Sequence, residues 1–214
     1  MKIDIVSDAI CPWCYVGKRR LEQALAQAPQ PDLELGWRPF QLNPDMPAEG
    51  MDRKAYLRAK FGDESGRNYD RIAAIGREVG IPFAFDRIKR TPNTILAHRL
   101  IRYSTREHRQ DEMVETLFRA YFTEGEDIGN PETLARLAGT AGLDPSLIET
   151  YLEGAEDDDT IRAEDAFARQ IGINGVPCFI IDRQYAISGA QPAEAFLEVF
   201  ELARNGGETP AEIV

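Results

Sequence analysis

Strand patterns occur only near the two ends of this sequence, and that distribution constrains the fold more than any other feature. A short apolar run at 3–6 and an alternating apolar run at 33–38 predict two strands near the start. Runs at 178–181 and 185–187, separated by a polar connection of hairpin length, predict two more near the end. A sheet built from these strands must therefore unite the two ends of the chain.

The intervening residues, from 43 to 157, show helical periodicity instead. Apolar side chains recur roughly every three or four residues from Tyr69, from Leu96 and from Met113 onward. Asn130 and Asp144 each precede a proline, the pattern of a capping side chain followed by proline at the first helical position. We expect an all-helical insertion here, without an internal repeat.

Further helices are expected beside the strands. Pro12 suits the first position of a helix, because its missing amide would have no partner there. A helix over 160–171 is expected to face the core with Ala163, Phe167 and Ile171, and a last helix is expected over 192–203. The order is β-α-β, a helical insertion, then α-β-β-α. This order predicts an α/β protein with a thioredoxin fold that is split by a large insertion.

The chain is long enough for one core with a large insertion, since domains usually contain roughly 100–200 residues. We expect residues 1–42 and 158–205 to form a discontinuous thioredoxin-like domain. Residues 43–157 would form the helical insertion domain, and 206–214 a C-terminal tail.

The composition makes several classes of protein improbable. Hydrophobic residues at 43% and charged residues at 29% are ordinary for a globular protein. Aspartate and glutamate outnumber lysine and arginine 36 to 25, so we expect neither nucleic acid nor an anionic membrane as a partner. No secretory signal pattern opens the sequence, and no apolar run reaches the roughly 18 residues that span a bilayer. We therefore expect a cytoplasmic protein, in which the three cysteines are thiols unless they cycle catalytically.

Cys11 and Cys14 carry the main functional signal, in the sequence Cys-Pro-Trp-Cys at the start of the first helix. Disulfide exchange needs a thiolate that attacks, a second thiol that resolves the mixed disulfide, and access to substrate. At a helix start, Cys11 faces unpaired amides and the positive end of the helix dipole, which favour a lowered pKa. Cys14 lies one turn further in and is expected to stay protonated. We predict thiol-disulfide exchange, with Cys11 attacking from an exposed position and Cys14 resolving.

A zinc site is the structural alternative, because paired cysteines at this spacing also begin many zinc sites. Zinc normally takes four ligands. Cys178 directly follows a proline at a strand start, and His98 and His108 lie on the helical insertion without ligand spacing to any cysteine. We therefore expect no metal.

The segment Gly175-Val176-Pro177-Cys178 directly precedes the third strand. Proline is tolerated at the first residue of a strand or in a cis turn. A cis Pro177 beside Cys11 would leave the backbone of Val176 available to an extended substrate. Cys178 is either an accessory redox thiol or a small buried residue that begins a core strand, and we favour the buried residue.

Six other residues have expected roles. Pro12 and Trp13 are predicted substrate contacts, because an aromatic side chain between two cysteines at a helix start is poorly placed for the core. Lys18 and the two arginines after it are expected to form a solvated face. Packing or a surface hydrogen bond is the expected role of His98, rather than catalysis.

Motifs along nearly the whole chain resemble the FrnE branch of the DsbA-like family. They lie at 11–20, 38–44, 93–94, 97–100, 117–122, 175–177 and 188–192. The resemblance implies a thioredoxin fold with an inserted helical domain and a disulfide oxidoreductase or isomerase. It further implies a catalytic pair at Cys11 and Cys14 and a cis proline at Pro177.

The sequence departs from this family in two places. Some FrnE relatives carry an extra cysteine pair near the carboxyl terminus, whereas no cysteine follows Cys178 here, and Cys178 itself stands where threonine or phenylalanine is expected. Kappa-class glutathione transferases and 2-hydroxychromene-2-carboxylate isomerases share the scaffold but generally use a serine near the position of Cys11. Glutathione-dependent isomerisation or transfer is therefore the alternative activity, and client binding without redox chemistry is a third.

The expected partners are proteins or small molecules that contain thiols or disulfides. No resident cofactor is expected, and glutathione fits as a reductant or co-substrate. The sequence leaves open the redox direction and whether the protein is a monomer or a homodimer.

Overall fold

The structure is a computed structural model that describes the backbone of residues 1–62 and 65–205 and the side chains of these ranges except 65–68. The expected C-terminal tail, 206–214, lies outside the described residues.

A four-stranded sheet unites the two ends of the chain, as predicted. Its strands are β1 (Lys2–Ser7), β2 (Glu34–Pro39), β5 (Cys178–Ile181) and β6 (Tyr185–Ser188), in the spatial order β2-β1-β5-β6. β1 pairs with β2 in parallel and with β5 in antiparallel orientation, and β5 and β6 form an antiparallel hairpin. The central position of β1 places its carboxyl end, and the turn that follows it, in the middle of the molecule.

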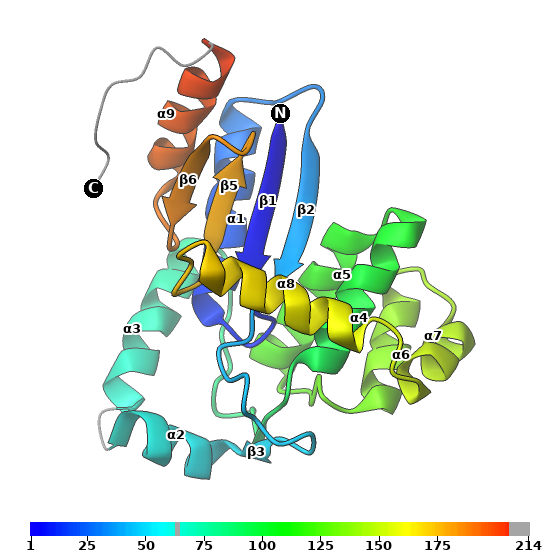
Figure 1. The fold of residues 1–214 in the computed structure, drawn as a ribbon. Coiled ribbons are helices and arrows are strands. Elements are labelled where there is room, and N and C mark those ends of the chain that lie inside the picture. The colour runs from blue at the N-terminus through cyan, green and yellow to red at the C-terminus, as the bar shows by residue number, and fades with distance from the viewer. Residues whose placement is uncertain (63–64, 206–214) are drawn as a thin grey trace.

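Two helices cover one face of the sheet, and a third crosses the other side (Figure 1). α1 (Pro12–Gln27) and α9 (Ala193–Arg204) pack together behind the strands, over a core that includes Ile3, Ile5 and Phe179. α8 (Asp158–Gln170) covers the opposite face, where Val6 and Cys178 are buried. Alternating side chains of β1 therefore supply both cores.

The predicted orientation of α8 is wrong. Phe167 is 59% exposed and Ile171 is 52% exposed, and Ala163 is also exposed. The buried face instead contains Ile161, Asp165 and Ala168. The helix turns this face inward because Asp165 has a buried hydrogen-bond partner. A carboxylate oxygen of Asp165 accepts the N–H of Gln41 at 2.8 Å, and this contact fixes the rotation of α8.

The insertion is helical except for one short strand pair. Its helices are α2 (Arg53–Phe61), α3 (Ser65–Glu78), α4 (Ile95–Ser104), α5 (Gln110–Arg119), α6 (Pro131–Thr140) and α7 (Pro145–Glu153), with a 3-10 turn at Thr105–Glu107 and a π-helical turn at Ala120–Glu124. The two-residue strands β3 (Met51–Asp52) and β4 (Arg90–Thr91) pair in antiparallel orientation. The sequence predicted an all-helical insertion, and this strand pair is the exception to it. Runs this short carry no periodic signal.

The predicted caps are confirmed. The side chain of Asn130 accepts the N–H of Thr133 at 2.9 Å at the start of α6, and that of Asp144 accepts the N–H of Ser146 at 2.9 Å at the start of α7. These bonds satisfy amides that have no partner within the helix.

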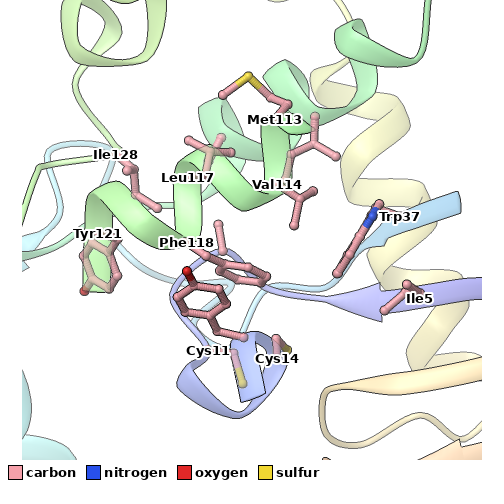
Figure 2. Packing of buried hydrophobic residues seen from close by; sticks show 14 of the residues in the cluster. Ile5, Cys11, Cys14, Trp37, Met113, Val114, Leu117, Phe118, Tyr121 and Ile128 are labelled. Atoms are coloured by element: carbon pink, nitrogen blue, oxygen red, sulfur yellow. The ribbon is translucent and has the colours of Figure 1, made fainter. Parts of the chain in front are cut away.

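One continuous hydrophobic core joins the sheet to the insertion. Tyr15 of α1 stacks on Phe118 of α5 at a centroid distance of 5.1 Å, and Trp37 of β2 meets the same ring edge-on at 6.1 Å. In Figure 2, Phe118 lies above the turn that carries Cys11 and Cys14. The insertion is thus packed directly against that turn. The division into a discontinuous domain of residues 1–42 and 158–205 and an insertion domain of 43–157 stays a prediction.

The described helices include none that combines the length and the apolar character needed to cross a membrane.

Candidate active site

Cys11 lies where β1 gives way to α1. It is the N-cap residue of the helix, with extended backbone angles (φ −91°, ψ 110°), and Pro12 follows as the first helical residue. Its N–H donates to the carbonyl of Asp8 at 2.9 Å, and its own carbonyl accepts the N–H of Cys14 at 3.0 Å. The strand, turn and helix are therefore arranged as the sequence predicts.

Both cysteines of this motif are free thiols with little exposure. Cys11 is 3% exposed and Cys14 is 1% exposed, so the predicted open position of Cys11 is wrong. Burial, and after it the hydrogen bond and charge of Cys11, raise the pKa of Cys14 well above its ordinary value. Burial and the neighbouring thiol therefore favour the protonated form of Cys14.

Cys11 lines a groove of about 490 Å³, which explains how a buried sulfur meets a substrate. Pro12, Trp13 and Val176 line the same groove next to it. The opposite wall comes from α2 and α3 of the insertion, which supply Arg53, Tyr56, Lys60, Phe61, Tyr69 and Arg71. These two helices lie beyond the carboxyl end of β1, where Cys11 follows (Figure 1).

The groove is basic although the chain carries a net charge of −11. Arg53, Lys60 and Arg71 contribute to its lining, and among the described residues no aspartate or glutamate does. Arg53 is 7% exposed and donates to the hydroxyls of Tyr69 at 2.7 Å and Thr91 at 3.1 Å. Among the described residues no carboxylate pairs with Arg53, so its charge is available to an anion that enters the groove.

The loop before β5 approaches Cys11 as the sequence predicts. The thiol of Cys11 donates to the carbonyl of Val176, with a sulfur-to-oxygen distance of 3.5 Å. The peptide bond between Val176 and Pro177 is cis. Pro177 is buried and is not part of the groove lining, and it packs so closely on α1 that a Cβ at Gly17 would lie 2.9 Å from its ring. Within the described ranges nothing accepts the N–H of Val176, which leaves it available to a substrate carbonyl.

Cys178 is placed away from the groove. It begins β5 opposite Val6, is 7% exposed, and packs with Phe40 and Ala168 on the α8 side of the sheet. Burial raises the pKa of its thiol. This placement agrees with the favoured interpretation of Cys178 as a buried residue that begins a core strand.

The predicted solvated face of α1 is wrong at Lys18, whose side chain is only 3% exposed. Its ammonium contacts the carboxylate of Glu22 and lies 3.2 Å from those of both Asp111 and Glu115. The last two belong to α5, so the reason is that α5 of the insertion covers this face of α1. The charge of Lys18 is therefore matched locally by three carboxylates.

Two further buried groups lie near the cysteines. Asp8 is fully buried between β1 and Cys11, and its carboxylate lies 3.5 Å from Nε2 of His98. Nε2 also lies 3.2 Å from the carbonyl of Phe40. The ring is 3% exposed, so His98 packs in the interior, one of its two predicted roles, and its hydrogen bond is buried and not at the surface. The other histidine, His108, is exposed. Across the described part of the chain, no group of three or more histidine, cysteine, aspartate or glutamate side chains could hold a metal ion.

Sequence reasoning missed Asp8 and the cationic wall. The signal for α2 was present, since Asp52 precedes a run of good helix formers and caps it by accepting the N–H of Ala55 at 2.9 Å. Nothing in the local sequence shows that this helix faces Cys11, because the contact is made across the fold.

The paired cysteines lie at the carboxyl end of a central strand, and the loop with the cis bond between Val176 and Pro177 contacts Cys11, which is the arrangement of a thioredoxin fold. The model of the DsbA-like thioredoxin domain matches residues 2–201, and the chain belongs to that family.

Individual relatives agree with this membership. A probable DsbA oxidoreductase from Streptomyces coelicolor is 33% identical, with a TM-score of 0.89, and the match covers 100% of this chain and 94% of that one. The uncharacterized protein YwbO of Bacillus subtilis is 28% identical, over 94% of each chain. The cytosolic disulfide reductase DsbM from Pseudomonas aeruginosa, solved with glutathione, is 16% identical with a TM-score of 0.69, over 96% of this chain and 100% of that one. This last likeness shows the fold alone.

Proposed function

We propose that this protein exchanges thiols and disulfides on protein, peptide or small-molecule substrates, with Cys11 attacking and Cys14 resolving. The observation that carries the proposal is that Cys11 lines the groove whereas Cys14 and Cys178 do not. A substrate sulfur in the groove can reach Cys11 and form a mixed disulfide with it. The sulfur of Cys14 then attacks the sulfur of Cys11 and displaces the substrate sulfur. The roles proposed for Pro12, Trp13 and Val176 are to contact the substrate, and Pro177, which is buried next to Val176, would act on the substrate by holding Val176 in position.

A trapping experiment tests the assignment. The Cys14→Ser variant should accumulate a stable mixed disulfide at Cys11, because the thiol that resolves it is gone. Cys11→Ser should react with no disulfide substrate, and the control Cys178→Ser should behave like the wild type. Mass spectrometry of the trapped species identifies the cysteine. An active Cys11→Ser variant, or a wild type that exchanges no disulfide, would refute the proposal.

The cations of the groove favour an anionic substrate. Arg53, Lys60 and Arg71 offer positive charge beside Cys11, and no acidic side chain in the described part of the lining opposes it. Glutathione, which carries two carboxylates and one ammonium, fits this charge as a reductant or co-substrate.

Charge reversal at the rim tests the substrate class. Lys60→Glu should slow the reaction with oxidised glutathione about fivefold, since an exposed charge interaction contributes up to about 1 kcal/mol. The same variant should react normally with the neutral 2-hydroxyethyl disulfide, which serves as the matched control. Equal effects on both disulfides would argue against charge recognition.

Glutathione-dependent isomerisation or transfer is the second candidate, and the cationic groove is the observation that favours it. This chemistry needs Cys11 but not Cys14. Equal turnover of a small electrophile with glutathione by the wild type and by Cys14→Ser would support it over disulfide exchange. Loss of turnover in Cys14→Ser would exclude it.

The redox direction follows from the reduction potential of the pair. A potential near the cytosolic glutathione poise would indicate a reductase or isomerase, and a much more oxidising one an oxidase.

We propose the cytoplasm as the compartment, in keeping with three cysteines that are all free thiols.

A further inference from the structure

One face of the sheet is covered by α8 only in part. In Figure 1, α8 crosses this face at the carboxyl end of β1 and leaves the rest of it open. At the covered end, Ala168 of α8 packs with Val6 and Cys178. In the next row of the same face, Asp4 of β1 lies opposite Ile180 of β5. Ile180 is only half-buried although β5 is an inner strand, so the sheet has an apolar position that the fold does not cover.

A cavity of about 580 Å³ lies at this open end. Its volume falls within the roughly 300–1,000 Å³ that is typical of pockets for small molecules. Most of the wall is apolar and comes from β1, β5, α8 and the loop after α8, which supply Val6, Phe167, Ala168, Ile171, Ile173 and Ile180. Among the described residues none lines both this cavity and the Cys11 groove, so the cavity is a site of its own and does not depend on the exchange proposed for Cys11.

Two large apolar side chains are exposed at the edge of the cavity. Phe167 and Ile171 lie one turn apart at the end of α8, and both line the cavity. In the part of the chain that the structure describes, only Phe61 and Leu147 are large apolar residues with comparable exposure. Apolar surface in water is unfavourable, and an apolar occupant would cover both side chains and Ile180 at once. The cavity therefore suits a ligand with an apolar body.

Charged side chains at the rim leave one positive charge without a partner. Asp4 pairs with Arg38 at 2.8 Å, and Glu164 pairs with Arg102 at 2.9 Å, so the carboxylates of the described lining are already neutralised. Arg183 also lines the cavity, and within the described ranges no carboxylate pairs with it. A single negative charge on the ligand would balance this guanidinium, whereas a cation would be repelled by it.

The backbone of Arg183 has a conformation that favours glycine. The turn between β5 and β6 places Asp182 at φ 50° and Arg183 at φ 58°. Aspartate is among the residues that tolerate positive φ, but the second position of such a hairpin turn is usually glycine. Arginine is therefore unfavourable for the turn itself, and what it adds at this position is a guanidinium at the rim of the cavity.

We propose that this cavity binds a small amphipathic carboxylate. Its apolar chain would lie between Ile180 of the sheet and Phe167 of α8, and its carboxylate would bind the guanidinium of Arg183. Arginine recognises a carboxylate through two parallel N–H donors. A dianion such as a phosphate monoester would exceed the one charge that is unmatched. The ligand class is thus a free monocarboxylic acid with an apolar chain or ring, such as a medium-chain fatty acid.

Decanoate is the probe, and isoleucine methyl groups report where it binds. In methyl NMR spectra of the full chain, decanoate should shift the signals of Ile171, Ile173 and Ile180, which line the cavity. The signals of Ile10 and Ile72, which line the basic Cys11 groove, should stay in place. An absence of shifts at the three isoleucines of the cavity would overturn the proposal, whatever is seen at the groove.

Arg183→Gly tests the contact with the carboxylate. Without the guanidinium, decanoate should bind about fivefold more weakly, as expected for an exposed charge interaction. The same variant should unfold at a higher urea concentration, because glycine suits the positive φ of the turn. Weaker binding by a more stable chain cannot come from damage to the fold. An unchanged affinity for decanoate would overturn the role of Arg183.

Phe167→Ser tests the contact with the apolar chain. Loss of the ring should weaken decanoate about tenfold, because the chain then keeps more of its surface in water. Leu147→Ser is the matched control, since Leu147 is as exposed as Phe167 but does not line the cavity, and its affinity for decanoate should equal that of the wild type. Equal affinities of the two variants would overturn the assignment of the cavity.

Two further measurements separate this ligand from other occupants. Decylammonium, which has the same chain length and the opposite charge, should bind the wild type more weakly than decanoate, and equal affinities would overturn the carboxylate class. Sedimentation equilibrium tests whether a second copy of the chain covers this face. A wild-type dimer that becomes a monomer in Phe167→Ser but not in Leu147→Ser would overturn the ligand site, whereas the same mass for all three chains agrees with it.

Discussion

Removing the charge of Lys18 should destabilise the junction between α1 and the insertion. The side chain of Lys18 is 3% exposed, and its ammonium lies against the carboxylates of Glu22, Asp111 and Glu115, whose side chains are 30–42% exposed. Breaking a fully buried ion pair costs about 3–5 kcal/mol, but partly exposed partners regain water and cost less. The carboxylate of Glu115 also keeps its contact with Arg19. We therefore expect Lys18→Met to lose about 2 kcal/mol of unfolding free energy, or about 4–8 °C in Tm for a chain of this length.

The loss should depend on pH in a defined way. Burial acts to raise the pKa of Glu115, but the hydrogen bond from Arg19 and the charge of Lys18 outweigh it, so this pKa lies below its ordinary value. Burial acts to lower the pKa of Lys18, and its three carboxylate partners outweigh it and raise the pKa. A lowered carboxylate pKa stabilises the fold above its unfolded value near about 4.3 and loses this effect as the pH falls through the folded value. A raised lysine pKa stabilises below about 10.4 and loses this effect as the pH rises through the folded value.

Urea unfolding of the wild type and Lys18→Met across pH measures this difference. It should be largest and flat between about pH 5 and 10 and should shrink on both sides. Lys54→Met is the matched control, because Lys54 is exposed on α2 and its loss should change the stability by less than about 0.5 kcal/mol. A Lys18→Met variant that behaves like this control, or a loss that is the same at every pH, would refute the reasoning.

Three substitutions test other parts of the fold by the same urea unfolding. Gly17→Ala should lose about 1 kcal/mol, because the new methyl group lies 3.0 Å from the ring of Phe179 and overpacking outweighs the better helix propensity of alanine; a more stable variant would contradict this packing. Asn130→Ala should lose about 1 kcal/mol with the cap to Thr133, and an unchanged midpoint would show that the cap contributes little. Phe167→Ser should cost less than about 0.5 kcal/mol, and a larger loss would mean that α8 faces the core differently.

The sequence by itself determined the strands, most of the helices and the place of the cysteine pair. These features depend on neighbours a few residues away. The cap of Asn130 on Thr133 and the first-turn position of Pro12 are complete within one helical turn, so a local pattern is enough to predict them. The two-residue strands β3 and β4 were missed, because they are too short to show a period and exist only through their pairing.

The tertiary structure decided everything that joins distant parts of the chain. Cys11 meets a carbonyl 165 residues away, and His98 meets one 58 residues away. The burial of Lys18 and the rotation of α8 follow from helices that pack beside them, and the cationic wall over Cys11 exists because the insertion lies there. Hydrophobic periodicity shows that a helix has a buried face. A charged residue can also be buried on a helix when a partner from a distant part of the chain neutralises it or bonds to it. The local sequence does not identify that partner.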